Sequence, residues 1–155
     1  MTYNSKVIFL DYDGVLTTPA SDYVFMPECL ERLGKILSNT QAKIVISSSR
    51  RGLTLEDTLE SITDPNNPHV RNVPFPFTED IIGITPHTIA WLRGQQIEAY
   101  LEGHPEVKAY VILDDENKFL AEQQKHLVLT NEETGLSESD VHRAIEILSH
   151  VDTTD

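Results

Sequence analysis

The sequence predicts an α/β fold, namely a doubly wound, three-layer sandwich around a central parallel sheet. Short apolar runs lack the polar alternation that is typical of half-exposed strands, which favours strands buried on both faces. Helical patterns lie between these runs, and strands that alternate with helices form parallel sheets through right-handed crossovers. The length of 155 residues fits one domain over residues 1–155.

The strands are predicted from runs of apolar and mostly branched residues. The clearest are Val7–Leu10, Ile44–Ile46 and Tyr110–Leu113. We expect Leu127–Leu129 as a fourth strand and Val70–Val73 as a weaker fifth. The carboxyl ends of parallel strands share one edge of the sheet, which is where ligands bind in open α/β folds.

Four helices are predicted from apolar residues at helical spacing and from signals at the helix ends. Pro27 suits the first turn of one helix, and Thr54 opens a near capping box ahead of a second. A third helix ends near Gly103, and Ser137 or Ser139 caps the last.

Residues 63–88 form the irregular part of the chain. They contain five of the eight prolines, so we expect extended segments and turns near the mouth of a site. Phe75, Phe77 and Trp91 could line that mouth, although packing in the core is the better interpretation.

The composition limits the partners and the setting of the protein. The net charge is −13, which disfavours binding along a nucleic acid duplex but allows a local basic pocket for one phosphate. Cys29 is the single cysteine, so no internal disulfide forms, and we expect it to be a small core residue. No apolar run is long enough to span a membrane, and we expect a cytoplasmic protein; the oligomeric state is not predicted.

Two pairs of aspartates follow predicted strands. Asp11 and Asp13 come directly after the first strand, and Asp114 and Asp115 end a later one. Carboxylates that are held together repel one another, and a cation relieves this repulsion. Mg²⁺ suits such a site because it binds a few carboxylates together with phosphate oxygens and water. The pattern predicts a metal-dependent site at one edge of the sheet.

The second strand ends in Ser47–Ser49, followed by Arg50 and Arg51. Hydroxyls and backbone N–H groups at the start of a helix form an anion site, although the same residues also serve as helix caps. Either arginine could add a charge-assisted hydrogen bond. We expect both arginines to be solvated or paired with Glu56 or Asp57 rather than to bind a ligand.

These motifs, in this order, resemble those of the haloacid dehalogenase superfamily of aspartate-nucleophile phosphatases. The matching elements are DYDGV after the first strand, a serine at the end of IVISSS, a basic residue that opens a helix, and LDD after a later strand. LDYDGVL, IVISSSRR, the segment from Arg93 to Ile97, YVILDD and TGLS look like the small domain of this type in Swiss-army-knife RNA repair proteins.

The resemblance implies roles for the aspartates. Asp11 is the nucleophile, which attacks phosphorus and forms an aspartyl-phosphate. Asp13 protonates the leaving oxygen and then activates water. Asp11, the backbone carbonyl of Asp13 and Asp114 hold Mg²⁺, and Asp115 is a second ligand or an orienting group.

The resemblance also implies how the phosphate is bound. Ser48 aligns best with the phosphate-binding hydroxyl of the family, and Ser47 is the alternative. Arg93 takes the place of the lysine that more often neutralises the nucleophile and the phosphate. The family carries caps at two positions, which here are Val15–Met26 and the stretch after the serines. The first is short and the second is irregular and rich in proline, so we expect a minimal cap or none. Such an open site suits bulky or macromolecular phosphorylated substrates.

Three functions follow as hypotheses. The first is Mg²⁺-dependent hydrolysis of a phosphomonoester on a small molecule. The second is a 3′- or 5′-phosphatase that acts on nucleic acid ends, and the third is a degenerate phosphate-binding module. In a receiver domain of a two-component system, an adjacent acidic pair follows the first strand and the acceptor aspartate ends the middle strand. Here the middle strand ends in serines and the second acidic pair comes late in the chain, so a receiver domain is disfavoured.

Overall fold

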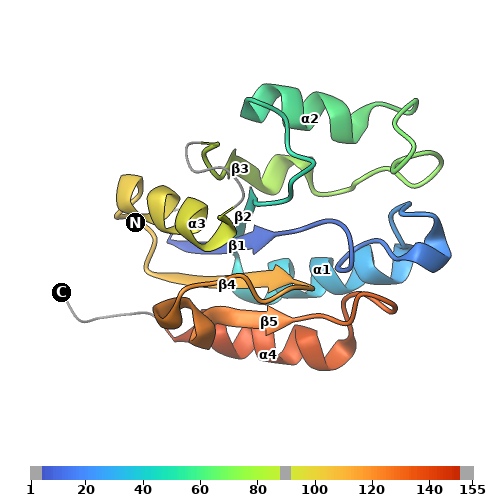
Figure 1. Ribbon diagram of the computed structural model, residues 1–155. Helices are drawn as coiled ribbons and strands as arrows, with labels where there is room; N and C mark the ends of the chain where they lie inside the picture. The colour runs from blue at the N-terminus through green and yellow to red at the C-terminus, as the bar shows by residue number, and fades with distance from the viewer. Residues whose placement is uncertain (1–4, 88–91, 151–155) are drawn as a thin grey trace.

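The protein is built around one five-stranded sheet, described in a computed structural model for residues 5–87 and 92–150 (Figure 1). All neighbouring strands are parallel, and their order across the sheet is β3-β2-β1-β4-β5. The strands are β1 Lys6–Leu10, β2 Lys43–Ile46, β3 Ile81–Ile84, β4 Ala109–Asp114 and β5 Leu127–Leu129. This order is that of a doubly wound fold and differs from the 2-1-3-4-5 order of receiver domains, which excludes that alternative.

Helices cover both faces of the sheet, so the predicted three-layer sandwich is confirmed (Figure 1). Helices α1 and α4 pack against each other on one face, and α3 covers the other. The α-helices are α1 Pro27–Thr40, α2 Leu55–Thr63, α3 Arg93–Gly103 and α4 Glu138–Ser149. Short 3₁₀ turns occur at Pro19–Ser21, Thr78–Asp80 and Ala121–His126.

Strand β1 explains why the apolar runs are continuous. Ile8 and Leu10 belong to the core beneath α1 and α4, whereas Val7 and Phe9 belong to the core beneath α3. All four side chains are fully buried. A strand at the centre of a sheet that is covered on both sides needs apolar residues at every position.

Two predictions within residues 63–88 need correction. Val70–Val73 was expected to be a strand, but it is a turn in which the Val73 N–H donates to the Val70 carbonyl at 2.7 Å. Arg71 there has a φ of 42°, which no strand residue adopts. The fifth strand is instead β3, which lies inside the segment that was expected to be irregular.

Other expectations for the elements are confirmed. Ser137 is the cap of α4, because its side chain accepts the Asp140 N–H, and Cys29 is buried in the core. Phe75 is buried and Phe77 packs against the core, whereas Trp91 lies outside the described residues.

The two expected cap positions hold only the turn at Pro19–Ser21 and, after β2, helix α2 with its turns.

Along the described ranges, no helix has the length and apolar character needed to cross a membrane.

Candidate active site

The register of the sheet brings the two aspartate pairs together. Leu10 pairs with Leu113, and the Asp11 N–H donates to the Leu113 carbonyl at 3.1 Å. The residues that follow, Asp11 and Asp114, therefore lie side by side where β1 and β4 end. Oxygens of Asp11, Asp114 and Asp115 lie within 4.8 Å of one another. In an open α/β sheet, ligands usually bind in the crevice at the point where the strand order reverses, and β1 and β4 lie on either side of that point.

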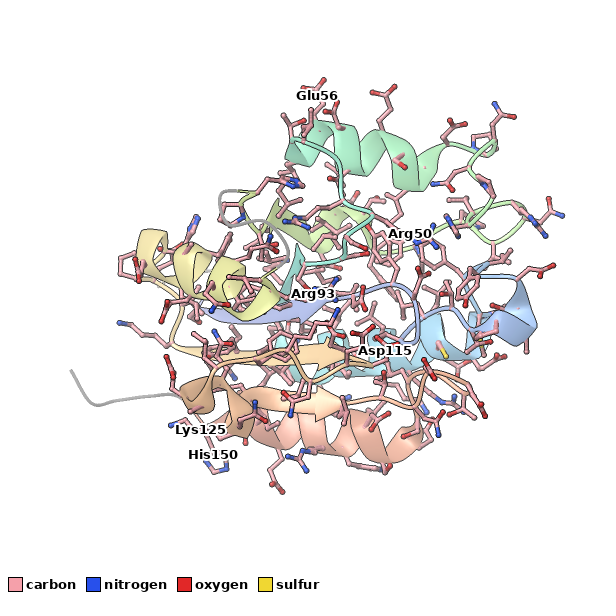
Figure 2. The ribbon with its side chains drawn as sticks, viewed as in Figure 1. Arg50, Glu56, Arg93, Asp115, Lys125 and His150 are labelled. Atoms are coloured by element: carbon pink, nitrogen blue, oxygen red, sulfur yellow. The ribbon has the colours of Figure 1, made fainter. Side chains whose placement is uncertain are left out.

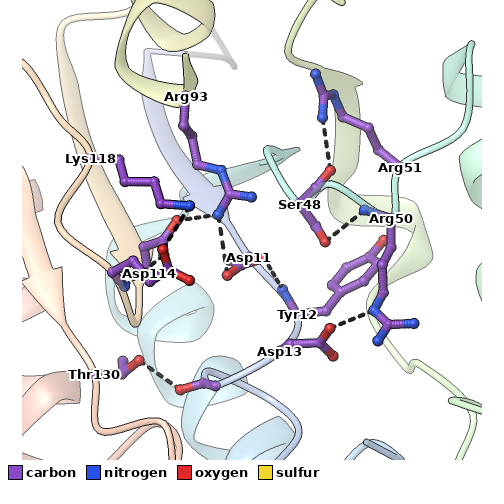
Figure 3. A network of polar contacts seen from close by, with 12 residues as sticks. Asp11, Tyr12, Asp13, Ser48, Arg50, Arg51, Arg93, Asp114, Lys118 and Thr130 are labelled. Carbon is purple, nitrogen blue, oxygen red and sulfur yellow. Dashed lines mark hydrogen bonds and ion pairs between the residues drawn. The ribbon is translucent and has the colours of Figure 1, made fainter. Parts of the chain in front are cut away.

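Arg93 provides the cation that faces this cluster. Its Nη1 atom lies 2.6 Å from Asp114 Oδ2 and 3.3 Å from Asp11 Oδ2. Arg93 is the first residue of α3, and the helix therefore carries its guanidinium to the edge of the sheet. Figures 2 and 3 show Arg93 pointing toward the aspartates from the opposite side of the crevice.

One arginine does not balance three carboxylates. Burial, and then the neighbouring charge of Asp114, raise the pKa of Asp11 from its ordinary value of 3.8 to about 7. The same two causes raise the pKa of Asp115 to about 6. A divalent cation removes this repulsion, and carboxylate oxygens are the ligands that Mg²⁺ prefers. The residues present therefore fit a divalent metal ion.

Gly14 allows the two acidic segments to approach each other. Its φ is 83°, and a Cβ atom at this position would lie 2.3 Å from Asp115 Oδ2. The Thr130 hydroxyl donates to the Gly14 carbonyl at 2.7 Å and ties this turn to the end of β5. A larger residue in place of Gly14 would displace the Asp115 carboxylate.

Asp13 lies beside the cluster and not within it. Its Oδ1 atom accepts a hydrogen bond from the Thr17 hydroxyl at 2.9 Å, and its Oδ2 atom lies 2.5 Å from Arg50 Nε. The carboxylate is therefore directed toward Arg50, away from Asp11 and Asp114 (Figure 3). Two aspartates that are two residues apart thus have different surroundings and can serve different chemical roles.

The three serines of the turn after β2 differ in their contacts. Ser49 lines the site cavity, whereas Ser47 and Ser48 are buried. The Ser48 hydroxyl accepts the Arg50 N–H at 3.1 Å, as expected of a turn cap. The buried Ser47 hydroxyl has no hydrogen-bond partner among the described residues. Of the three serines, Ser49 lines the cavity, Ser48 caps the turn, and Ser47 keeps a hydroxyl without a partner in the described part of the chain.

The expectation for the two arginines after the serines holds in part for Arg50, which is exposed, and is wrong for Arg51. Arg50 pairs with Asp13, and Glu56 points outward from the far side of α2 (Figure 2). Arg51 is buried, and it lies within ion-pair distance of no carboxylate in the described part of the chain.

Arg51 donates instead to neutral acceptors from three elements. Nη1 donates to the Ser48 carbonyl and Nε to the Thr85 carbonyl, both at 2.9 Å, and Nη2 donates to Gln96 Oε1 at 3.2 Å. It thereby joins the serine turn, the end of β3 and helix α3. The sequence does not indicate this role, because Arg51 is one of two adjacent arginines and its acceptors at Thr85 and Gln96 lie far away in the chain.

The acidic cluster opens into a cavity of about 630 Å³. Asp11, Asp13, Arg93 and Asp115 were predicted to belong to the site, and all four line this cavity. Ser49 and Arg51 also line it, and both belong to the segment that the sequence marks as a candidate anion site. The sequence did not single out the remaining lining residues, which are His87, Gln96, Glu116 and Lys118. The cavity combines a metal-binding edge with fixed positive charges, an arrangement that suits a phosphate group.

A comparison with protein families identifies the chain. Residues 7–141 match the family described as the HAD domain in Swiss Army Knife RNA repair proteins. The chain belongs to this family. The match spans β1 through the beginning of α4 and therefore includes every site residue named above. No curated protein and no solved structure shows a significant match to the chain.

Proposed function

We propose that the protein is a Mg²⁺-dependent phosphomonoester hydrolase that acts through an aspartyl-phosphate on Asp11. The observation that carries the proposal is the Asp11, Asp114 and Asp115 cluster, which faces Arg93 with Asp13 immediately beside it. Membership of the HAD domain family supports the same chemistry. Mg²⁺, when bound, neutralises the carboxylates and polarises the phosphoryl oxygens.

The residues divide the work of the first half-reaction. Arg93 and the turn after β2 orient the incoming phosphate group, and their positive charge and N–H groups balance its negative charge. The Asp11 carboxylate attacks phosphorus, and the bond from phosphorus to the ester oxygen breaks. Asp13 enters this step protonated, with its ion pair to Arg50 broken, and gives its proton to that oxygen, so the alcohol leaves in a neutral form.

The second half-reaction restores the enzyme. Asp13, now ionised, accepts a proton from a water molecule that attacks the phosphorus of phospho-Asp11. The bond between phosphorus and the Asp11 oxygen breaks, and inorganic phosphate leaves. Asp11, Asp114 and the backbone carbonyl of Asp13 would hold the metal ion, with Asp115 as a second ligand or an orienting group.

The test is phosphate release from p-nitrophenyl phosphate and from nucleoside monophosphates, with Mg²⁺ or with EDTA. We expect turnover with Mg²⁺ only, and no turnover in Asp11→Asn. Asp22→Asn is the matched control, because it makes the same chemical change at an exposed turn residue whose φ of 56° asparagine tolerates. Full activity in Asp11→Asn would sink the proposal.

A phosphatase for nucleic acid ends is the second candidate. The RNA repair context in the description of the family favours it. The net charge of −13 opposes it, because the protein repels a polyanion at long range. Faster turnover of a 3′- or 5′-phosphorylated oligonucleotide than of mononucleotides would favour this candidate.

A degenerate phosphate-binding module is the third candidate. All four acidic positions are intact, which opposes it. Stable phosphorylation of the protein without turnover would favour this candidate over both enzymes.

A further inference from the structure

A second cavity lies next to the active site. It has a volume of about 400 Å³ and is lined by Tyr12, Phe25, Arg50, helix α2 and the turn at 64–69. It shares no lining residue with the active-site cavity. Since Asp13 lines one cavity and Arg50 the other, the ion pair between these two residues forms the boundary.

Arg50 places a positive charge at this boundary. Its guanidinium contacts the His69 ring through Nη1 and lies 6.0 Å from the centre of the Tyr23 ring. The other ring nitrogen of His69, Nδ1, is 2.5 Å from the Tyr23 carbonyl and must donate to it, so Nε2 is free to accept from Arg50. In the described ranges, Asp13 is the one carboxylate in ion-pair contact with Arg50, whose side chain is 37% exposed.

Tyr12 supplies an independent observation. It lines the second cavity and is only 7% exposed, yet its hydroxyl has no hydrogen-bond partner in the described part of the chain. A buried hydroxyl without a partner is unfavourable, and a bound ligand can satisfy it. Figure 3 shows the Tyr12 ring on the same side of the Asp11–Asp13 turn as Arg50.

The walls of the cavity indicate the chemistry of its ligand. Tyr12 and Phe25 pack edge to face, with 5.7 Å between ring centres, and give the cavity an aromatic side. Arg50 and His69 give it a side that is rich in hydrogen-bond donors and acceptors. Arg50 Nε faces Asp13 and Nη1 faces His69, whereas Nη2 has no partner among the described residues and can donate a charge-assisted hydrogen bond to a phosphate oxygen. An aromatic wall beside such a group suits a nucleoside that carries a phosphate.

We propose that this cavity binds the alcohol part of the substrate, and that Arg50 selects nucleotide esters with a second phosphate group. The inference rests on the proposed function, in which Asp13 contacts the leaving oxygen. The leaving alcohol then lies beside Asp13. Arg50, on the side of Asp13 that faces the second cavity, is the next residue that the alcohol reaches. Nucleoside bisphosphates and oligonucleotide ends share this chemistry, because in both a second phosphate flanks the ester that is cleaved.

The test compares phosphate esters with and without a second phosphate. Adenosine 3′,5′-bisphosphate is measured against adenosine 3′-phosphate and adenosine 5′-phosphate. A 3′-phosphorylated dinucleotide and a 5′-phosphorylated dinucleotide are measured against the same two nucleotides. For the wild type we expect kcat/KM to be about tenfold higher with the second phosphate, because one charge-assisted hydrogen bond has this magnitude.

Arg50→Gln should reduce this preference to about twofold or less, and Arg71→Gln should leave it intact. Arg71 is a matched control, since it is exposed and lies two residues beyond His69 without lining the cavity. Asn66→Trp, at the exposed rim, should lower the preference by filling the cavity. A preference for the bisphosphate or for either dinucleotide supports the proposal, and equal turnover of all the substrates overturns it.

Hydrolysis of p-nitrophenyl phosphate separates this inference from the proposed function. If the wild type hydrolyses that ester but shows no preference for a second phosphate, the inference fails and the proposed function stands. If no ester is hydrolysed, titration calorimetry of adenosine 3′,5′-bisphosphate with Mg²⁺ tests the cavity directly. Binding that weakens about tenfold in Arg50→Gln supports the cavity, and absent or unchanged binding overturns it.

Discussion

Asp11 is held in a position that is unfavourable without a metal ion. Its Oδ1 atom accepts the Tyr12 N–H at 2.9 Å, and its Oδ2 atom is shared with Arg93. The carboxylate is nevertheless almost fully buried beside Asp114. Without a cation, this arrangement destabilises the ionised form of Asp11. Once a cation is bound, Asp11 can ionise, and the ionised carboxylate is the form that acts as a nucleophile.

The raised pKa values predict how stability depends on pH in the metal-free protein. Asp11 and Asp115 bind protons more tightly in the folded state, with pKa values of about 7 and about 6, than in the unfolded state. The folded state therefore holds more protons between about pH 4 and pH 7, and the free energy of unfolding falls as pH rises through this window. We expect a loss on the order of 2 kcal/mol in EDTA, measured by urea unfolding.

Two comparisons check the source of this effect. Saturating Mg²⁺ should abolish most of the decline, because it binds the ionised carboxylates of the folded state. Asp11→Asn in EDTA should flatten the profile and raise the stability at pH 7, whereas Asp22→Asn should leave it unchanged. A wild-type profile that rises through the same window would contradict the assignment.

Some site residues were predictable and others were not. Asp11, Asp114 and Asp115 each follow an apolar run, so the residues themselves indicate a shared sheet edge, and the family resemblance adds Arg93. Arg51 gave no such signal, because its partners at Thr85 and Gln96 are brought near only by the fold. Choosing among the serines required the direction of each hydroxyl, which their spacing does not determine.

At the scale of elements, the turn between β2 and α2 separates two serine roles. Ser47→Ala should lower kcat/KM by about tenfold with little effect on stability, because the hydroxyl has no partner within residues 5–87 and 92–150. Ser48→Ala should cost about 1 kcal/mol of stability through loss of the turn cap. Steady-state kinetics and thermal unfolding of both variants give the result. A larger kinetic loss in Ser48→Ala would restore the expectation from the family resemblance.

Arg51 connects three elements, and its removal should affect stability more than the removal of Arg50. Arg51→Met leaves the carbonyls of Ser48 and Thr85 without this donor inside the protein, so we expect a loss of about 2–4 kcal/mol. Arg50→Met should cost less than about 1 kcal/mol, because the Arg50 side chain is partly exposed and its ion pair is screened. Urea unfolding of both variants measures the difference, and equal losses would be inconsistent with the connecting role.

The two errors in the strand prediction have a common cause. In β3, a four-residue strand with Gly83 at its third position gives too short a signal within a proline-rich stretch. Val70–Val73 is equally short, and its two valines reach the core from a turn and not from a strand. Two buried apolar side chains at a spacing of three are compatible with a turn as well as with a strand, and the sequence alone does not distinguish a turn from a strand.

At the scale of the whole molecule, the alternation of strands and helices was enough to predict the parallel sheet and its two covered faces. The strand order could not be derived from the alternation itself, because several doubly wound orders share it. The order β3-β2-β1-β4-β5 is seen in the structure. The placement of Asp11 beside Asp114 then follows from the register of β1 against β4.

The acidic surface predicts an unusual dependence on salt if the substrate is an oligonucleotide. Most proteins that bind nucleic acids lose affinity as salt rises. Here the net charge of −13 repels the polyanion at long range, and salt screens this repulsion. We expect kcat/KM for a phosphorylated 10-mer to rise about twofold or more between about 20 and 150 mM NaCl, with p-nitrophenyl phosphate as the control. A steep decline for the 10-mer would indicate a basic binding surface instead.

Trapping the phosphorylated enzyme tests the central claim most directly. The Asp13→Asn variant should slow hydrolysis of the intermediate, so that acid quenching after reaction with Mg²⁺ and a phosphomonoester leaves a phosphoryl group on the protein. Mass spectrometry of the digested protein should locate that group on Asp11, and the double variant with Asp11→Asn should carry none. Substrate turnover without a phosphoryl group on Asp11, or with one on another residue, would contradict the proposed mechanism.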